Sequence, residues 1–426
     1  MSDTILKNNE SVGVLKFKLI VMNFLQFAVW GSWLISLGAY LGGTLHFSGI
    51  QIGSFFATMG IASIFMPTLM GIIADKWIAP ERLISLCHLV AGAFMFWAAQ
   101  QIDYGSLYAL ILLSVCFYMP TLGLTNAVAY SKLTANGLDT VKHFPPIRVF
   151  GTIGFIVAML VVDWVGAKMT NMQLYISGGL SILIAIYMFV FSPTPIIKKE
   201  KSEQDTWVEK LGLQAFALFK ERRMAIFFIF SMLLGICLQI TNGYANDYLT
   251  NFFGQMPEYA NSFGVTHSGT LISLSQISEA LCILLIPFFL KRFGIKAVML
   301  ISLFAWVIRF GFLGLGNPGD GLWLLIMSMI VYGVAFDFFN ISGSLYVDNN
   351  THPSIRSSAQ GVFLMMTNGF GSFIGSYVAG WVVDAKGYPT SWYIFSMYAL
   401  VVTIAFYFLF KDSKDSNKKH VGVDLV

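Results

Sequence analysis

Long apolar runs with almost no charge are the feature that most constrains this chain. Only 11% of its 426 residues are charged, whereas 56% are hydrophobic. A soluble domain carries about 25% charged residues, so this chain has too few to cover a water-facing surface of its size. The composition therefore excludes a soluble enzyme, a disordered chain and a fibrous repeat, and it indicates that lipid is a second solvent.

Hydropathy predicts twelve membrane-spanning helices, because one span needs about 20 mostly apolar residues. Runs of this length exclude a β-barrel, whose strands are short and alternate between apolar and polar residues. The predicted helices cover 17–41, 50–74, 83–100, 106–131, 146–166, 172–192, 223–248, 267–290, 296–315, 320–346, 357–382 and 390–410.

The distribution of basic residues supports this division and predicts the orientation of the chain. If both tails and the even-numbered loops lie on one side of the membrane, that side holds 23 of the 26 Lys and Arg residues. The opposite side holds only Lys168 and Lys386, and Arg309 falls inside a helix. Because cytoplasmic loops carry the excess of Lys and Arg, we expect both termini in the cytoplasm.

A charged segment near the midpoint divides the predicted helices into two groups of six. A weak internal repeat agrees, because Gly71–Trp77 follows the second predicted helix and Pro287–Gly294 follows the eighth. Two six-helix halves related by an axis along the membrane normal are typical of the major facilitator superfamily. The expected parts are a tail over 1–16, a bundle over 17–192, a linker over 193–222, a bundle over 223–410 and a tail over 411–426.

The loop after the second predicted helix carries a Gly-x-x-x-Asp-Lys pattern with an Arg following, which resembles the loop motif of that superfamily. A carboxylate near a helix end can bond the N-terminus of a neighbouring helix or a loop Arg. We expect such a contact to latch one conformation and to break in the other, with a solvated loop charge as the alternative. The residues of this predicted latch are Gly71, Asp75, Lys76 and Arg82.

Polar residues within the predicted helices are the candidates for function, because a charge inside the membrane is costly and normally faces a cavity or a partner. Gln239 and Asn242 are three residues apart, as are Gln276 and Glu279, so each pair shares one helix face. Further candidates lie on the fifth and tenth predicted helices. The expected substrate-binding residues are Arg148, Thr152, Phe155, Gln239, Asn242, Gln276, Glu279, Tyr332 and Phe336.

These side chains suit a small polar ligand with hydroxyls and a flat apolar face, because amides and carboxylates bond hydroxyls while aromatic rings stack. A nucleoside and a sugar both fit, and the residues alone do not separate them. Each polar pair has a structural alternative, namely hydrogen bonding between helices, and each aromatic residue can pack against lipid instead.

Two arginines are harder to assign from the sequence. Arg309 is expected to be a structural partner of a carboxylate. If its helix begins at Pro145-Pro146, Arg148 lies near the cytoplasmic face. If the helix begins near Thr140, Arg148 lies about two turns inside it.

Asp337 and Glu279 are the candidates for carrying a proton. Burial favours the neutral form of a carboxyl group, so such a residue can gain and lose a proton as its exposure changes. We assign proton coupling first to Asp337, because Glu279 shares a helix face with Gln276 and is expected to bind the ligand.

Cysteine and histidine patterns predict neither a metal site nor a cofactor. The four Cys lie in apolar stretches without a CxxC pair, and the six His lie mostly in or near loops and are never four apart. The basic residues are scattered, so nucleic acid is not expected as a partner. An intramembrane enzyme would need a nucleophile with its base, or a metal site, within the helices, and the sequence shows no such pattern. A sensor would need an output domain, and the predicted linker and tails are too short for one.

Several segments resemble the nucleoside:proton symporter family of the major facilitator superfamily, typified by bacterial nucleoside and xanthosine permeases. The similarity covers nearly the whole chain and thins at both tails, in the linker and near 250–266. The segments are Phe24–Trp33, Phe144–Thr152, Leu238–Asn242, Ser275–Glu279 and Ala335–Gly343.

This resemblance implies import of nucleosides with protons across a bacterial cytoplasmic membrane, by rocking of the two halves about a midplane site. The site residues of the family match the substrate-binding set above together with Asp337. The acid Asp247 departs from the family pattern and leaves the substrate range open. A proton-coupled carrier of sugars or nucleobase-like solutes is the alternative, and we expect a monomer in the lipid bilayer.

Overall fold

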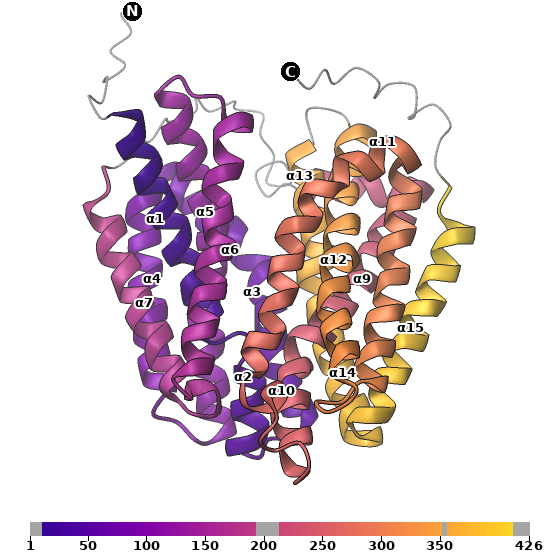
Figure 1. The fold of residues 1–426 in the computed structure, drawn as a ribbon. Coiled ribbons are helices and arrows are strands. Elements are labelled where there is room, and N and C mark those ends of the chain that lie inside the picture. Colours follow the sequence, from indigo (N-terminus) through magenta and orange to yellow (C-terminus); the bar gives the residue numbers. More distant parts are fainter. Residues whose placement is uncertain (1–10, 193–212, 352–355, 412–426) are drawn as a thin grey trace, which may run out of the picture. The chain divides into compact units, whose positions relative to one another are not determined.

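The computed structural model describes residues 11–192, 213–351 and 356–411, and within these ranges every regular element is a helix (Figure 1). Eleven of these helices are long and apolar enough to cross a membrane. Most of the predicted tails and linker lies outside the described residues.

One of these eleven helices contains two predicted spans. The helix α11 runs over Ser268–Leu315, 48 residues, and it turns at Gly294, where φ is 77° and ψ is 168°. A positive φ of this kind strains any residue with a Cβ atom, so glycine is suited to the turn. With α11 counted as two spans, the predicted all-helical fold with twelve membrane helices is confirmed.

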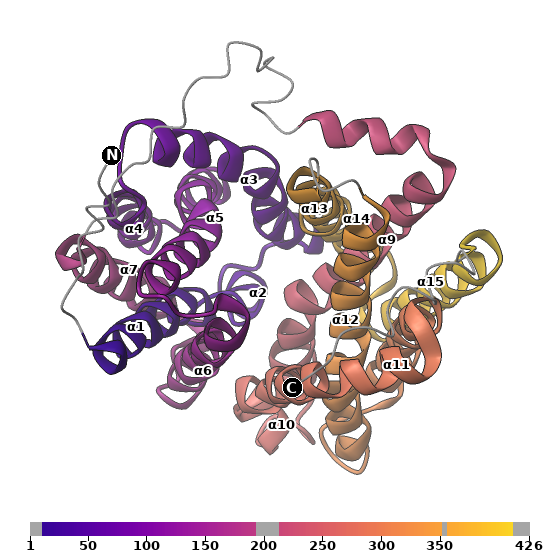
Figure 2. The same cartoon turned by 90° about the horizontal axis from the view of Figure 1, so that it is seen from above.

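The described residues pack into two units, one within Met1–Tyr40 and Phe65–Glu200, the other within Leu41–Ile64 and Lys201–Val426. In the first unit, α1 packs against α6 and α7, and α4 packs against α5 and α7 (Figure 2). The long helices that begin and end in this unit are α1 (Val12–Gly31), α4 (Pro80–Ala98), α5 (Tyr104–Ala135), α6 (Thr140–Trp164) and α7 (Met172–Val190).

Close packing between α1 and α6 depends on glycine. A Cβ atom on Gly31 would collide with the backbone of Phe155, and a Cβ atom on Gly154 would collide with the backbone of Phe24. Small residues allow helix backbones to approach each other closely in a membrane, where lipid is as apolar as the side chains. These two glycines therefore fix how α6, which carries three of the candidate site residues, lies against α1.

The first predicted span, 17–41, is wrong at its C-terminal end. Here α1 ends at Gly31 and the chain continues through a turn into the short α2 (Leu37–Ala39). The hydroxyl of Ser32 bonds the carbonyl of Val29 at 2.8 Å, and that of Ser36 bonds the side chain of Gln173 at 2.8 Å. Serine hydroxyls that bond nearby carbonyls compete with the helix ladder, which hydropathy does not register.

In the second unit, α11 packs against α12 and α15, and α9 packs against α14. Its members include the first part of α3 (Gly49–Lys76), because residues 41–64 pack here. The other helices of this unit are α9 (Arg222–Asp247), α10 (Phe263–Thr266), α11, α12 (Leu322–Asn350), α13 (Arg356–Leu364), α14 (Ser372–Lys386) and α15 (Tyr388–Leu409).

Candidate functional site

The structure decides the depth of Arg148. The helix α6 begins at Thr140 and contains Pro145 and Pro146 in its interior, so Arg148 lies about two turns inside the helix. Its guanidinium carbon is 3.9 Å from the centroid of the Phe27 ring on α1. A cation held over an aromatic face at this distance is stabilised by the ring quadrupole.

Two further candidates on α6 follow Arg148 at helical spacing. Thr152 is half-buried, and Phe155 is buried with its ring 6.3 Å from Trp30 in an edge-to-face arrangement. Trp30 in turn lies 6.0 Å from Tyr118 on α5. Arg148 and Phe155 thus contact aromatic rings of α1, namely Phe27 and Trp30. These two rings, together with Tyr118 on α5, were not assigned to the site from the sequence.

A buried polar network centred on Gln26 lies beside these aromatic rings. The Gln26 amide donates to the Thr121 hydroxyl at 2.8 Å, and its oxygen accepts from Thr125 at 3.1 Å. His88 bonds the same oxygen through Nε2 at 2.9 Å, and the Tyr118 hydroxyl donates to the Gln26 carbonyl at 2.8 Å. All five residues are buried, so the network joins α1, α4 and α5 and fixes the Tyr118 ring against Trp30.

The Gln26 network was missed, although the sequence carried a signal for it. Asn23 and Gln26 are three residues apart, which is the spacing that identified the polar pairs on two other helices. His88 is fully buried in α4 and is an exception to the placement of the histidines in or near loops.

In the second unit, the predicted polar pair on α9 consists of Gln239 and Asn242, and the contacts of Gln239 link two helices. The Gln239 amide donates to the Ser372 hydroxyl on α14 at 2.5 Å, a contact between helices of the kind given as the structural alternative. The Gln239 side-chain oxygen is buried and has no hydrogen-bond partner among the described residues. Asn242 is half-buried. Gln239 therefore links α9 to α14 through its amide nitrogen, while its side-chain oxygen can still accept a hydrogen bond.

The carboxylates and aromatic rings predicted on α11 and α12 come together. Tyr332 stacks on Phe336 with ring centroids 5.9 Å apart and an interplanar angle of 17°. Asp337 is 3% exposed, its Oδ2 has no hydrogen-bond partner among the described residues, and the negative charge of Glu279 acts on it. Two nearby carboxylates repel when both are ionised, so protonation of one stabilises the cluster.

Arg309 does not pair with a carboxylate in the described part of the chain, so that expectation is wrong. Its Nη1 donates to the carbonyl of Ser328 at 2.5 Å, and its guanidinium carbon lies 4.7 Å from the Tyr332 ring centroid. The residue is fully buried. Arg309 lies on the part of α11 after the turn. The carbonyl of Ser328 on α12 and the face of the Tyr332 ring stabilise its charge, so Arg309 holds Tyr332 in place.

The predicted latch is only partly described. Gly71 lies in α3, and the side chains of Asp75 and Lys76 lie outside the described residues. Arg82 lies on α4, with its guanidinium carbon 4.3 Å from the Phe189 ring centroid.

Beside Arg82 is a buried ion pair that sequence reasoning missed. Glu81 is fully buried in the first turn of α4 and lies 3.4 Å from the ammonium of Lys132 on α5. Lys132 also donates to the carbonyl of Ser192 at 2.6 Å, after the end of α7. The pair therefore joins the ends of three helices near the motif.

The unexpected acid Asp247 belongs to a hydrogen-bonded group at the end of α9. Tyr388 and Asn251 both donate to its carboxylate. Asp247 is 5% exposed, so its charge is buried and compensated by two donors. Its role in the described structure is thus to hold the end of α9 against the start of α15.

Among the described residues, no group of three or more His, Cys, Asp or Glu side chains is placed to hold a metal ion. In the described part of the chain, eleven membrane-length helices, one of which contains two spans, carry carboxylates, amides and stacked rings, as in a secondary transporter of the major facilitator type. A family model described as "Nucleoside H+ symporter" matches residues 14–415, and the chain belongs to that family. It is therefore a proton-coupled nucleoside transporter of the membrane.

Two similar proteins and one similar solved structure agree with this assignment. The chain is 49% identical to xanthosine permease of Escherichia coli K12 over 414 residues, covering 95% of this chain and 98% of that protein. It is 48% identical to nucleoside permease NupG of Escherichia coli K12 over 416 residues, covering 96% and 97%. A crystal structure of nucleoside transporter NupG matches with a TM-score of 0.87, covering 94% of this chain and all of that one.

Proposed function

We propose that this transporter imports nucleosides with protons by alternating access, and that the substrate contacts the predicted residues of α6, α9, α11 and α12. The stacked pair of Tyr332 and Phe336, next to Glu279 and Asp337, supports this proposal most directly. Stacked rings offer a face to a nucleobase, and carboxylate oxygens accept hydrogen bonds from ribose hydroxyls.

Each polar candidate has a role that follows from its chemistry. Gln276 and Glu279 accept bonds from ribose hydroxyls, and the uncommitted oxygen of Gln239 accepts from a donor on the base or sugar. Asn242 and Thr152 offer further donors and acceptors. Arg148, held over Phe27, presents donors that match a base carbonyl.

Asp337 is proposed as the proton carrier. It is more buried than Glu279, and its Oδ2 has no partner among the described residues, so the charged form is poorly compensated. Bound substrate engages Glu279, which leaves Asp337 to take and release the proton. The charges of Glu279 and Asp337 act on each other, so engaging one carboxylate affects the other and links the two events.

The orientation and the boundaries are proposed on the sequence pattern. Both termini are placed in the cytoplasm of a bacterial cell, in its inner membrane, by the excess of Lys and Arg on one side. The two six-helix bundles are taken to be 17–192 and 223–410, and Gly71, Asp75, Lys76 and Arg82 to be the latch between conformations. The chain is proposed to act as a monomer and to carry out no catalysis.

Equilibrium binding of uridine to the purified protein tests the proposed substrate contacts. Phe336→Ala should weaken binding by about 1–3 kcal/mol, or roughly 5- to 150-fold, because a base loses its stacking partner. Glu279→Gln should also weaken binding, since a charged acceptor is replaced by a neutral one. The control is Phe304→Ala, which removes an aromatic ring that is 50% exposed on α11. Unchanged uridine affinity in both site variants would refute the proposed contacts.

A further inference from the structure

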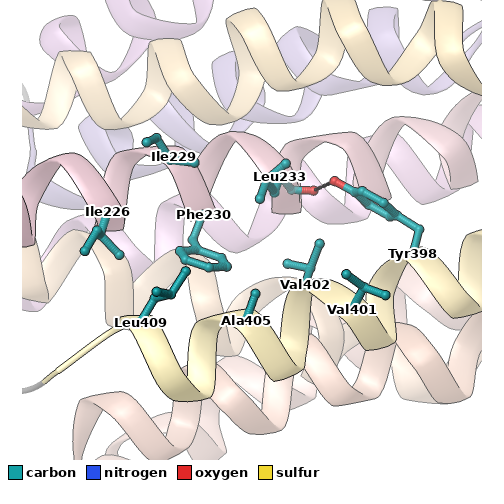
Figure 3. Close-up of a pocket in the computed structure, with 9 residues that line it drawn as sticks. All are labelled: Ile226, Ile229, Phe230, Leu233, Tyr398, Val401, Val402, Ala405 and Leu409. Atoms are coloured by element: carbon teal, nitrogen blue, oxygen red, sulfur yellow. Dashed lines mark hydrogen bonds between the residues drawn. The ribbon is translucent and has the colours of Figure 1, made fainter.

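A groove of about 390 Å³ runs between α9 and α15 (Figure 3). Ile226 and Phe230 line it from α9, and Val402, Ala405 and Leu409 line it from α15. Its lining is aliphatic and aromatic. Such a groove within two membrane spans favours a hydrocarbon occupant over a polar solute.

The two ends of the groove differ. At one end, the hydroxyl of Tyr398 donates to the carbonyl of Leu233 at 2.9 Å and bridges the two helices (Figure 3). At the other end lie Ile226, near the start of α9, and Leu409, the last residue of α15. The eleven residue steps from Tyr398 to Leu409 correspond to about 16 Å of helix, close to the ~15 Å of hydrocarbon in one leaflet.

Basic residues stand at the second end. Arg222 and Arg223 open α9 and come four and three residues before Ile226, so both lie on the helix face that bears the groove. Both are exposed, and so is Lys411 just beyond α15. The acid Glu221 precedes the helix with extended backbone and is exposed at the same end. The lysine and arginine distribution predicts this end to be cytoplasmic.

We propose that this groove binds an anionic phospholipid of the cytoplasmic leaflet, with one acyl chain along α9 and α15 and the phosphate held by Arg222 and Arg223. The guanidinium fork matches phosphate geometry, and basic clusters at the cytoplasmic ends of membrane helices attract anionic lipid. The groove, about 390 Å³ and about 16 Å long along α15, corresponds in length to one acyl chain within a single leaflet.

Native mass spectrometry of the delipidated protein, titrated with phosphatidylglycerol or phosphatidylcholine of the same acyl chains, tests the headgroup part. The protein should bind one phosphatidylglycerol at least tenfold more tightly than phosphatidylcholine. Arg222→Gln with Arg223→Gln should abolish this preference. The matched control is Lys291→Gln with Arg292→Gln, a basic pair on α11 outside the groove, which should retain it. Equal binding of both lipids by the unaltered protein would overturn the proposal.

The acyl-chain part needs a second pair of variants. Ala405→Phe fills the groove and should lower the affinity for both phospholipids, whereas Ile404→Phe, at a 51% exposed position on α15, should not. Glycerol phosphate has the headgroup charge without an acyl chain. It should not displace phosphatidylglycerol from the protein when the lipid is present at a concentration that saturates the site. Three outcomes would each contradict an acyl-chain site. They are displacement of lipid by glycerol phosphate, unchanged lipid binding in Ala405→Phe, and a dimer of the protein that Ala405→Phe converts to monomer.

Discussion

The carboxylate of Asp384 accepts a 2.5 Å hydrogen bond from the backbone amide of Gly49, the first residue of α3. The amide of Ile50 donates to the same carboxylate at 2.8 Å, and Tyr244 donates to the Gly49 carbonyl at 2.8 Å. The first amides of a helix have no partner within it and carry a partial positive charge, so an acid from α14 is well placed there. A Cβ atom on Gly380 would collide with the Gly49 backbone, so the helices touch at this point.

Replacing Asp384 by Asn should loosen the start of α3, because a neutral oxygen interacts less strongly with the helix N-terminus. The expected loss is about 0.5–1 kcal/mol, since the side chain is exposed. Hydrogen exchange at the amides of Gly49 and Ile50 should become faster. The neighbouring Lys386→Gln serves as the control and should leave these amides unchanged. Equal protection in the unaltered protein and in Asp384→Asn would show that the carboxylate does not hold the helix.

Replacing Gln26 by Leu should destabilise the first unit by about 1–3 kcal/mol, the cost of leaving one buried polar group without its hydrogen bond. His88 loses its bond to Gln26 through Nε2, whereas Thr121 and Thr125 lose Gln26 but still donate to backbone carbonyls. Thermal unfolding of the purified protein measures this loss. Thr121→Val, which removes one of these bonds, should have a smaller effect. A Gln26→Leu protein as stable as the unaltered one would contradict the role of the network.

Asp103 gives a prediction for the pH dependence of stability. It precedes α5 and accepts from the amides of Ser106 and Gly105, each at 3.0 Å. A hydrogen bond from the Ser106 side chain, and after it these two amide bonds, hold the pKa of the Asp103 carboxyl below the usual 3.8. Because the folded-state pKa is the lower one, the stabilisation is complete above pH 3.8 and is lost as the pH falls through the folded-state value.

Thermal unfolding of Asp103→Ala at several pH values checks this sign. The variant should unfold at a lower temperature than the unaltered protein at pH 7, and the gap should close as the pH falls below 3.8. A gap that widens toward acid would contradict the assignment of this residue as a helix cap.

Replacing Asp337 by Asn should separate binding from proton coupling. Asparagine keeps the size and hydrogen-bonding capacity of the side chain but cannot carry a proton. In proteoliposomes the variant should still exchange labelled uridine for internal uridine, while an inward proton gradient should no longer drive accumulation. Asp348→Asn, an acid near the end of the same helix, is the control. Gradient-driven accumulation by Asp337→Asn would assign the proton to another group.

Much of the fold follows from the sequence because a membrane span is set by length and hydropathy. The prediction places a break between 290 and 296, and the structure turns at Gly294. Hydropathy did not detect the end of α1 at Gly31, since the next residues are as apolar as a helix. It also left the start of α6 open, because two prolines stand inside that helix.

The candidate site was predictable where polar residues share a face of one helix, as for Gln276 and Glu279. Contacts that depend on packing between helices were not. The support of Tyr332 by Arg309 and the bond from Gln239 to Ser372 join segments far apart in the chain, and helix periodicity contains no information on such pairs. A sequence alone therefore identifies polar residues at depth but not their partners.

The central claim is tested by uptake into proteoliposomes of the unaltered protein. Labelled uridine, adenosine, guanosine, xanthosine and a pentose would each be offered with an inward proton gradient, with no gradient, and with a protonophore. We predict that at least one nucleoside accumulates above its external concentration, only with the gradient, and that the pentose does not. Accumulation of the pentose alone, or nucleoside accumulation that survives the protonophore, would contradict the account.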